Sequence, residues 1–420
     1  MIQWREYKFS DFVEINPKVS LKKGLEYSFV EMKDLSEGNK FIMPSQKRNL
    51  TGGSRFENGD TLFARITPCL ENGKICQVNK LENGIGFGST EFLVFRGKED
   101  ISDSNFVYYL SLSNEVRSFA EQNMVGTSGR QRVSWQVFDN LFLTLPPLPT
   151  QTAIAEILSS LDDKIELNNK INQDLENLAQ TLFKQWFIDF EFPNENGEPY
   201  KSSDGEMVES ELGEIPKGWE VGTIYKISDV IYGAPFKSSL FNQENRGFPL
   251  IRIRDLKTFK PQYWTEEIHP KRTKIYAGDL IVGMDAEFRP QIWLGQEAWL
   301  NQRLCHFKPK AGFSKLFVRE IIRPQLAFFE NSSVGTTVIH LGKADIDTFK
   351  SIIPTERTLL TFEELSTSIF NDIINNSIEN QQLTTLRDTL LPKLISGELG
   401  VSMQTLRPIT DISKKISNEL

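Results

Sequence analysis

The 420-residue sequence contains little cysteine and little histidine. Its three cysteines, Cys69, Cys76 and Cys305, are too few and too widely spaced for a disulfide framework or a zinc site. The histidines show no metal-ligand spacing, and neither a GKS or GKT phosphate loop nor a glycine-rich cofactor fingerprint is present. We therefore expect no metal and no cofactor, and we expect the reducing environment of the cytoplasm.

Long hydrophobic runs and catalytic motifs are also missing. No stretch approaches the roughly 18 apolar residues that cross a bilayer, and the N-terminus lacks a signal-peptide pattern. The Asn/Asp-Pro-Pro-aromatic run that serves amino-methyl transfer is absent. Glu31, Met32 and Lys33 are similar to the end of a nuclease motif, but no acidic partner stands at a suitable place upstream. These absences predict a non-catalytic protein without a membrane segment.

The totals show no excess of basic residues, which would be the simplest sign of a DNA-binding protein. Lys and Arg number 48 against 56 Asp and Glu, and the formal net charge is -8. The charge is unevenly distributed, however, because residues 189–214 are strongly acidic whereas residues 215–355 carry a basic excess. A local positive field of this kind permits nucleic-acid binding without proving it.

The sequence repeats itself once. The repeated pairs are KFSDFV (8–13) and KISDVI (226–231), GDTL (59–62) and GDLI (278–281), VGT (125–127) and VGT (334–336), LNN (167–169) and INN (374–376), and TLF (181–183) and TLL (389–391). Each match is weak alone, but all five occur in the same order. They indicate a tandem duplication of a unit of about 210 residues.

Each repeat begins with a domain, residues 1–149 and 215–355. Short β-branched and aromatic runs, broken by Gly, Asn and Pro, are typical of a mixed α+β domain with a twisted sheet. The acidic stretch 189–214 contains Gly, Pro and Ser and is interpreted as a charged linker. Residues 399–420 form a C-terminal tail. The fold class is therefore α+β, with two similar domains.

Each repeat ends in a long helix, residues 150–188 and 356–398. Apolar positions step by three and four along both helices, which is the spacing of a coiled-coil seam. Asparagines interrupt both seams midway, and buried polar seam residues fix the register of a coiled coil. We expect these asparagines to meet across an antiparallel pair, although helices that each cover only their own domain remain the alternative. The seam consists of Leu158, Leu161, Ile165, Asn168, Asn172, Leu175, Leu182, Leu365, Ile369, Ile373, Asn376, Asn380, Leu383, Leu386 and Leu390.

Several motifs resemble those of type I restriction-modification DNA-specificity subunits. PPLPTQ (146–151) resembles the exit from their first target-recognition domain, and SELGEIPKGW (210–219) resembles the entry to the second. TLRDTLLPKLISGEL (385–399) resembles the end of their second conserved helix. Further similar stretches are FARITPCLENGK (63–74), GRQRVS (129–134), PFKSSLFN (235–242), IRIRDL (251–256) and NQR (301–303). Together the motifs cover nearly the whole chain in the family's order.

The resemblance implies two target-recognition domains separated by two long antiparallel helices, in a pseudo-twofold arrangement. Each domain would read one half of a split, asymmetric double-stranded DNA target. Two DNA adenine methyltransferase subunits would dock on the helices, and ATP-driven restriction/translocase subunits would join. The alternative function is a coiled-coil scaffold that carries two protein-binding domains, which salt-dependent DNA binding would exclude.

Candidate DNA-binding residues are exposed donors in loops, because bases are read by side chains in the grooves and phosphates are held by Lys and Arg. For base reading in the first domain we select Arg130, Arg132 and Thr127, and for phosphate binding Lys47, Arg48, Arg55, Arg65 and Lys74. In the second domain we select Lys237, Arg252, Arg254, Lys271, Arg272 and Arg289, with Thr336, Thr337 and His340 in the matching loop. Any one of them could instead be a solvated surface charge. Because the two matching loops differ in sequence, we expect a target that is not a palindrome.

Overall fold

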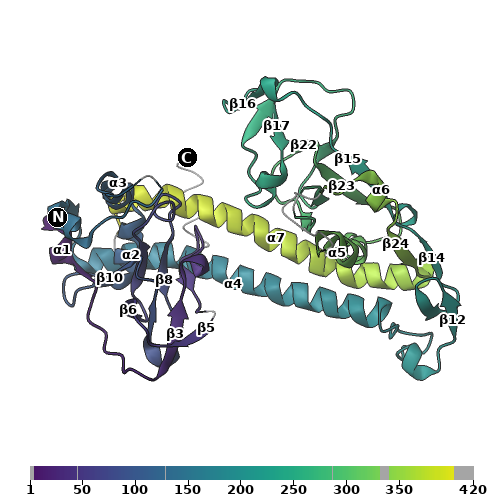
Figure 1. The fold of residues 1–420 in the computed structure, drawn as a ribbon, viewed down its shortest axis with the longest axis horizontal. Coiled ribbons are helices and arrows are strands. Elements are labelled where there is room, and N and C mark those ends of the chain that lie inside the picture. The colour runs from purple at the N-terminus through teal and green to yellow at the C-terminus, as the bar shows by residue number, and fades with distance from the viewer. Residues whose placement is uncertain (1–3, 45, 128, 286, 332–339, 402–420) are drawn as a thin grey trace. The chain divides into compact units, whose positions relative to one another are not determined.

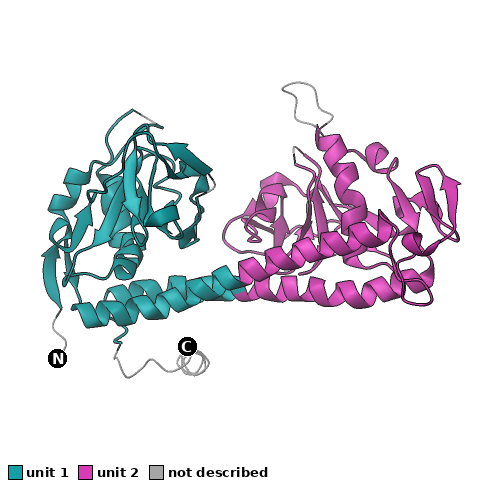
Figure 2. Cartoon of the chain, turned by 90° about the horizontal axis from the view of Figure 1, so that it is seen from below, with its two compact units in different colours: residues 1–167, 380–420 teal, residues 168–379 magenta. Residues whose placement is uncertain are grey.

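A computed structural model shows two compact units in the chain. Unit 1 comprises residues 1–167 and 380–420, and unit 2 comprises residues 168–379 (Figure 2). In the part of the chain that the structure describes, no helix combines the length and the apolar character needed to cross a membrane. The described residues are 4–44, 46–127, 129–285, 287–331 and 340–401.

The domain of unit 1 contains three groups of paired strands. Its main sheet has the order β2-β10-β7-β8-β4, a second sheet has the order β5-β3-β9-β6, and β1 pairs with β11. The strands are β1 (Arg5–Lys8), β2 (Val13–Ile15), β3 (Glu26–Val30), β4 (Phe41–Ile42), β5 (Gln46–Asn49), β6 (Ser54–Glu57), β7 (Thr61–Ala64), β8 (Ile75–Val78), β9 (Ile85–Gly88), β10 (Phe92–Gly97) and β11 (Phe142–Leu145). Buried aromatic rings such as Phe9, Phe63, Phe95 and Phe138 form the centre of its core.

Three short helices belong to this domain: α1 (Phe9–Phe12), α2 (Ser104–Leu112) and α3 (Asn114–Gln122). The chain breaks between α2 and α3 because Ser113 has an extended backbone and its hydroxyl accepts a hydrogen bond from Val116 N. A serine in this position caps the N-terminus of the following helix. The Asp103 side chain caps α2 in the same way, by accepting from Phe106 N.

The domain of unit 2 contains strands β14 (Glu220–Thr223), β15 (Ser228–Tyr232), β16 (Phe241–Asn242), β17 (Phe248–Ile251), β18 (Tyr263–Thr265), β19 (Lys274–Ile275), β20 (Leu280–Gly283), β21 (Pro290–Ile292), β22 (Ala298–Leu300), β23 (Leu304–Pro309) and β24 (Lys350–Ile353). Its sheets have the orders β15-β23-β20-β21 and β16-β18-β17-β22-β19, and β14 pairs with β24. The helices are α5 (Lys315–Asn331) and α6 (Lys343–Ile346).

The pairing of the strands confirms the internal repeat. The series β2-β10-β7-β8 corresponds to β15-β23-β20-β21, and β5-β3-β9-β6 corresponds to β18-β17-β22-β19. The central pairs β3–β9 and β17–β22 are both parallel, whereas their neighbours are antiparallel. Of the described strands in these sheets, only β4 and β16 have no counterpart. The two domains therefore share one topology.

The acidic segment 189–214 is folded, which differs from the expected linker. Within it, β12 (Met207–Ser210) pairs with β13 (Gly213–Pro216). The Phe192 ring stacks on the rings of Tyr200 and Trp219, at centroid distances of 4.7 and 4.9 Å. Aromatic residues lie among the carboxylates of this segment, and their burial against the unit 2 core orders the backbone.

Two helices of 40 residues, α4 (Leu148–Phe187) and α7 (Glu356–Ile395), are labelled in Figure 1. The chain passes from one unit into the other within each helix (Figure 2). Within unit 1, Asp162 of α4 contacts Arg387 of α7; within unit 2, Asn172 contacts Asn376. The partner numbers fall as the α4 numbers rise, so the helices are antiparallel. The expected antiparallel helix pair is confirmed.

The expectation that seam asparagines meet is confirmed for Asn172 and Asn376. Asn376 Nδ2 donates to Asn172 Oδ1 at 2.9 Å, and Asn172 Nδ2 donates to Ser377 Oγ at 3.0 Å. Asn168 instead donates to Glu379, at 2.7 Å. Of the other seam residues, Leu158, Leu161, Ile165, Ile373 and Leu390 are buried, and Leu175, Leu182, Ile369, Asn380, Leu383 and Leu386 are half-buried.

Leu365 was wrongly assigned to the seam. Its side chain is 47% exposed, whereas its neighbour Ser366 is fully buried. The buried positions in this part of α7 are Phe362, Ser366, Phe370 and Ile373. The inward-facing position is occupied by a small polar residue, Ser366. Because the prediction selected apolar residues, it chose the neighbouring Leu365 instead.

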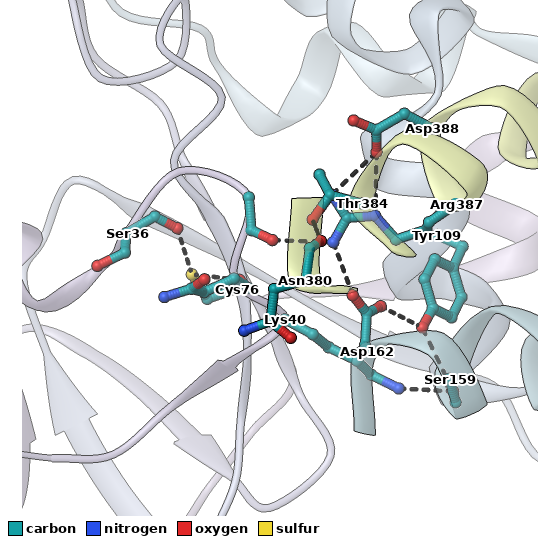
Figure 3. A network of polar contacts seen from close by, with 12 residues as sticks. Ser36, Lys40, Cys76, Tyr109, Ser159, Asp162, Asn380, Thr384, Arg387 and Asp388 are labelled. Carbon is teal, nitrogen blue, oxygen red and sulfur yellow. Dashed lines mark hydrogen bonds and ion pairs between the residues drawn. The ribbon is translucent and has the colours of Figure 1, made fainter. Parts of the chain in front are cut away.

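Buried ion pairs tie the domains to the helices. In unit 1, Arg387 Nη1 donates to Asp162 Oδ1 at 2.6 Å and to Gly38 O at 2.8 Å, and Asp162 Oδ2 accepts from the Tyr109 hydroxyl at 2.6 Å (Figure 3). Burial opposes the charge of Arg387, but Asp162 raises the pKa of its guanidinium above the usual value. In unit 2, Arg319 of α5 forms a bidentate ion pair with Glu176 of α4, in which Nη1 and Nη2 donate to the two carboxylate oxygens at 2.8 and 2.7 Å.

Replacing Arg387 with leucine should destabilise unit 1. The substitution leaves the Asp162 carboxylate buried without its cation, and breaking a buried pair on one side costs about 3–5 kcal/mol. The double variant Arg387→Leu/Asp162→Leu should recover part of this loss, as measured by urea unfolding. Asp388→Ala removes only the exposed partner of Arg387 and serves as the control. Equal unfolding free energies for the wild type and Arg387→Leu would contradict the assigned role.

Candidate nucleic-acid interface

Three loops of the unit 1 domain meet at the end of β7. Arg65 N donates to Glu91 O at 3.0 Å, and Val133 N donates to Arg65 O at 2.9 Å. Thr67 N donates to Gln131 O at 3.1 Å, and Gln131 N donates to the Thr67 hydroxyl at 3.0 Å. This junction, residues 65–67, 91, 125–127 and 129–133, includes four of the candidate residues, namely Arg65, Thr127, Arg130 and Arg132.

An ion pair holds the junction of unit 1. The Arg132 guanidinium donates to both Glu91 carboxylate oxygens, at 2.8 to 3.0 Å. Glu91 raises the pKa of Arg132 by hydrogen bonding to it. Arg130 is exposed, and no partner of its side chain is found in the described part of the chain. Arg132 therefore positions the loop, whereas Arg130 presents five free donors to solvent.

A basic cleft of about 560 Å³ lies next to this junction. Lys18, Arg55 and Arg65 line it together with small and apolar residues, and none of the described residues that line it is acidic. Arg65 Nε is buried and has no hydrogen-bond partner in the described structure. A buried donor without an acceptor is energetically costly.

Three other candidates of the first domain are engaged by the protein itself. Lys74 Nζ donates to Met32 O at 2.9 Å, and Lys47 pairs with Glu82 at 2.8 Å. Arg48 pairs with Glu31 and covers the Phe29 ring, with a guanidinium-to-centroid distance of 4.1 Å. These three charges therefore serve contacts within the domain.

The second domain has the same junction with different side chains. Met284 N donates to Arg303 O at 2.8 Å, and Leu341 N donates to Met284 O at 2.9 Å, which repeats the backbone bonds of Arg65. The Asp285 carboxylate lies 2.6 Å from His340 Nδ1 and 3.6 Å from Arg303 Nη1. His340 thus corresponds to Arg132 of unit 1, and Arg303 corresponds to Glu91. The charge at the Glu91 position is therefore positive in unit 2 and negative in unit 1.

The remaining candidates of the second domain fall into two groups. Arg252 covers the Tyr263 ring at 4.1 Å, Arg272 lies 5.4 Å from the Trp299 ring, and Arg289 lies 3.8 Å from Glu330. Lys237, Arg254 and Lys271 are exposed, and their side chains have no charged partner among the described residues. Thr336 and Thr337 lie outside the described residues.

Sequence reasoning missed Lys18, Glu91, Asp285 and Arg303. Lys18 stands in no motif, and only the cleft places it beside Arg55 and Arg65. Glu91 and Arg303 follow the strands β9 and β22 at equivalent places in the repeat, which is a signal that an alignment of the two halves could have revealed. In the described part of the chain, no cluster of His, Cys, Asp and Glu could hold a metal ion.

Comparison with known proteins agrees with this architecture. Residues 1–177 match the family described as the type I restriction modification DNA specificity domain. The chain is 27% identical to the HindI specificity subunit of Haemophilus influenzae, over 95% of this chain and all of that protein. The chain is therefore similar to type I specificity subunits along nearly its whole length. It is also 28% identical to the MjaIX specificity subunit of Methanocaldococcus jannaschii, over 95% of this chain and 94% of that protein.

A solved structure has a fold similar to that of this chain. The type I restriction-modification S subunit from M. genitalium aligns with a TM-score of 0.53 at 13% identity, over 94% of this chain and 96% of that one. At this identity the likeness concerns the fold alone. Two domains and two long helices are therefore features of a known architecture.

The basic cleft should contribute to DNA affinity through phosphate contacts. Replacing Lys18, Arg55 and Arg65 together with alanine should make the log–log dependence of affinity on salt less steep by about 2 to 3, because each phosphate contact contributes about 0.9. Fluorescence anisotropy of a labelled duplex at several salt concentrations measures this slope. Lys170→Ala, which removes an exposed charge of α4, should leave the slope unchanged. An unchanged slope in the triple variant would place the phosphates elsewhere.

Proposed function

We propose that this chain is the sequence-specific DNA-binding subunit of a type I restriction-modification complex. Residues 1–149 form the first target-recognition domain and residues 215–355 the second, and each reads one half of a bipartite target in duplex DNA. Adenine methylation and restriction are carried out by partner subunits, so this chain supplies recognition and no catalytic group. The complex works on chromosomal and incoming DNA in the cytoplasm.

The repeated junction is the observation that carries this proposal. The same backbone hydrogen bonds hold Arg65 and Met284 in the two domains, but the side chains around them differ in charge. A groove-reading surface needs such a fixed backbone with variable donors and acceptors. Arg132 with Glu91 on one side and His340 with Asp285 on the other support two unlike half-sites, and hence an asymmetric target.

The helices α4 and α7 are proposed to carry the methyltransferase subunits and to set the spacer between the half-sites. Both helices pass without interruption through the division between the units, at 167/168 and 379/380. A helix of 40 residues measures about 60 Å at about 1.5 Å per residue, which exceeds one turn of B-DNA, about 34–36 Å. Exposed apolar residues of α4, including Leu167, Ile171 and Leu178, suit a partner surface.

The rival function, a coiled-coil scaffold with two protein-binding domains, has no specific support in the structure. A scaffold would not require the basic cleft of unit 1 or the buried, unsatisfied Arg65 Nε. The absence of salt-dependent DNA binding by the assembled complex would favour the scaffold.

Mapping methylated adenines in cells that express the complex tests the function directly. We expect a bipartite, non-palindromic motif that disappears when this chain is deleted. Arg130→Ala should relax the sequence at one half-site only, because a good base contact discriminates by about 1–3 kcal/mol and Arg130 belongs to one domain. Lys170→Ala should reproduce the wild-type motif. Methylation without a motif, or a change at both half-sites, would contradict the proposal.

Lengthening both helices tests the spacer. Insertion of seven residues into α4 after Leu167 and into α7 after Glu379 preserves the phase of the seam and adds about 10 Å. The methylated motif should keep its bases while its spacer grows by about three base pairs. The matched control inserts seven residues into the exposed loop at Gly197. New half-site bases with the old spacer would show that the helices do not set the distance.

A further inference from the structure

A cavity of about 660 Å³ lies within unit 2 between the domain and α7. Its walls come from the turn before β20, from β23, from the start of α5 and from α7. His306, Lys308 and Lys315 line it, together with Asp279 and, on α7, Glu363 and Thr367. None of the residues proposed to contact DNA lies in its wall.

The equivalent place in unit 1 is filled by the chain itself. Lys40, which is 4% exposed, extends its ammonium to Asn105 Oδ1 at 3.2 Å and to Ser159 Oγ at 2.7 Å (Figure 3). The loop before it is held by Arg387, and Gln77 N donates to Lys40 O at 2.7 Å where β4 joins β8. The segment from Ser36 to Ile42 therefore acts as a plug between the sheet and both helices.

Structural landmarks align the two sites. Asp103 and Ser314 cap α2 and α5 in the same way, and α4 and α7 begin at Leu148 and Glu356. On this alignment, the Lys40 partners Asn105 and Ser159 correspond to Leu316 and Thr367. Both of these residues line the cavity. The cavity of unit 2 thus lies at the position that the segment from Ser36 to Ile42 fills in unit 1.

In the described part of unit 2, the connection that corresponds to the Lys40 segment is shorter. In unit 1, residues 35–45 connect the turn Met32–Asp34 to β5 and include β4. In unit 2, only residues 257–262 connect the corresponding turn Ile253–Leu256 to β18. Among the described strands, β21 is therefore the last of its sheet, whereas its counterpart β8 is covered by β4.

The charged residues of the site differ between the units. Burial lowers the pKa of Lys40 in unit 1, and Asp162, Asp163 and Asp103 act against this by favouring its charged form. Their counterparts Phe370, Asn371 and Ser314 are neutral, and all three line the cavity. Lysines 308 and 315 stand in the cavity wall, with Asp279 and Glu363. A lysine plug would lose its counter-charges in unit 2, whereas a carboxylate beside the two lysines would meet cations.

Asp279 of the cavity lacks the arginine partner that its counterpart in unit 1 has. In unit 1, Arg96 binds the buried Asp60 at 2.6 and 2.7 Å. In unit 2, the Asp279 carboxylate accepts from Tyr276 N at 2.8 Å, but its charged neighbours are farther away, 3.7 Å to His306 Nε2 and 4.0 Å to Lys315 Nζ. Lys315 Nζ donates to an uncharged acceptor, Gly278 O, at 2.7 Å, so its charge is not closely paired.

We propose that this cavity receives an acidic, extended segment of a partner subunit, which inserts a carboxylate between Lys308 and Lys315 as the unit 1 plug inserts Lys40. The inference rests on the proposed function, in which the partner is the methyltransferase subunit. Because unit 1 fills the equivalent site itself, the two units offer the partner unequal contacts. One of the two methyltransferase copies is thereby bound more tightly than the other.

The full-length chain, its purified methyltransferase subunit and a target duplex are used for the test. Lys308→Glu and the cavity-filling Thr367→Trp should each weaken one of two binding steps by about tenfold or more, as seen by calorimetry. Lys226→Glu, an exposed charge outside the cavity, is the control and should bind as the wild type does. Benzoylphenylalanine at Thr367 should crosslink to a segment rich in Asp and Glu, which mass spectrometry identifies.

The outcomes separate this inference from the proposed function. The inference is overturned if both cavity variants bind with unchanged affinity, if the crosslink goes to a basic segment, or if no crosslink forms. Normal methylation of the target in these cases would leave the proposed function intact. A wild-type chain that binds neither the methyltransferase nor DNA overturns both. Loss of one binding step together with a crosslink to an acidic segment supports the acidic plug.

Discussion

Each domain is fastened to a helix that comes from the other half of the sequence, and a buried arginine makes each attachment. Arg387, on the helix of the second repeat, enters the first domain and binds Asp162 and Gly38. Arg319, in the second domain, binds Glu176 on the helix of the first repeat. Sliding or separating the helices would leave these charges buried and unpaired, which is strongly unfavourable. The antiparallel pairing of the helices and its register therefore fix how each domain is attached to the helices.

Duplication supplies two copies of one scaffold, and the side chains make the copies different. The backbone bonds at Arg65 and Met284 are the same, because they close the same sheet against the same loop. The side chains around this frame differ between the units, since backbone hydrogen bonds do not require a particular side chain. Fold and specificity are separated in this way, so a single topology can present two unlike surfaces to DNA.

The repeats have also diverged away from the junctions. Unit 1 covers β8 with β4 and places the buried Lys40 against Asn105 and Ser159, whereas in unit 2 no described strand covers β21 and a cavity lies at the corresponding place. The two halves of the chain therefore share a topology but not the contacts that it makes.

Part of the candidate interface could be predicted from the sequence. Arg130 and His340 were selected from the repeat, and both lie at the junctions. Which charges are available could not be predicted, since Lys47 and Lys74 are engaged by Glu82 and Met32 whereas Arg130 is exposed. Availability depends on neighbours that are distant along the chain.

The sequence by itself determined the duplication, the α+β class of the domains and the two antiparallel helices, because periodicity and internal similarity are local properties of the chain. It also predicted that asparagines would meet across the helices. Only the tertiary structure decided that Ser366 rather than Leu365 faces inward, that residues 189–214 fold around Phe192, and that Lys18 joins Arg65 in one cleft. These features arise from packing between segments far apart in the chain, and no local pattern encodes which of them will meet.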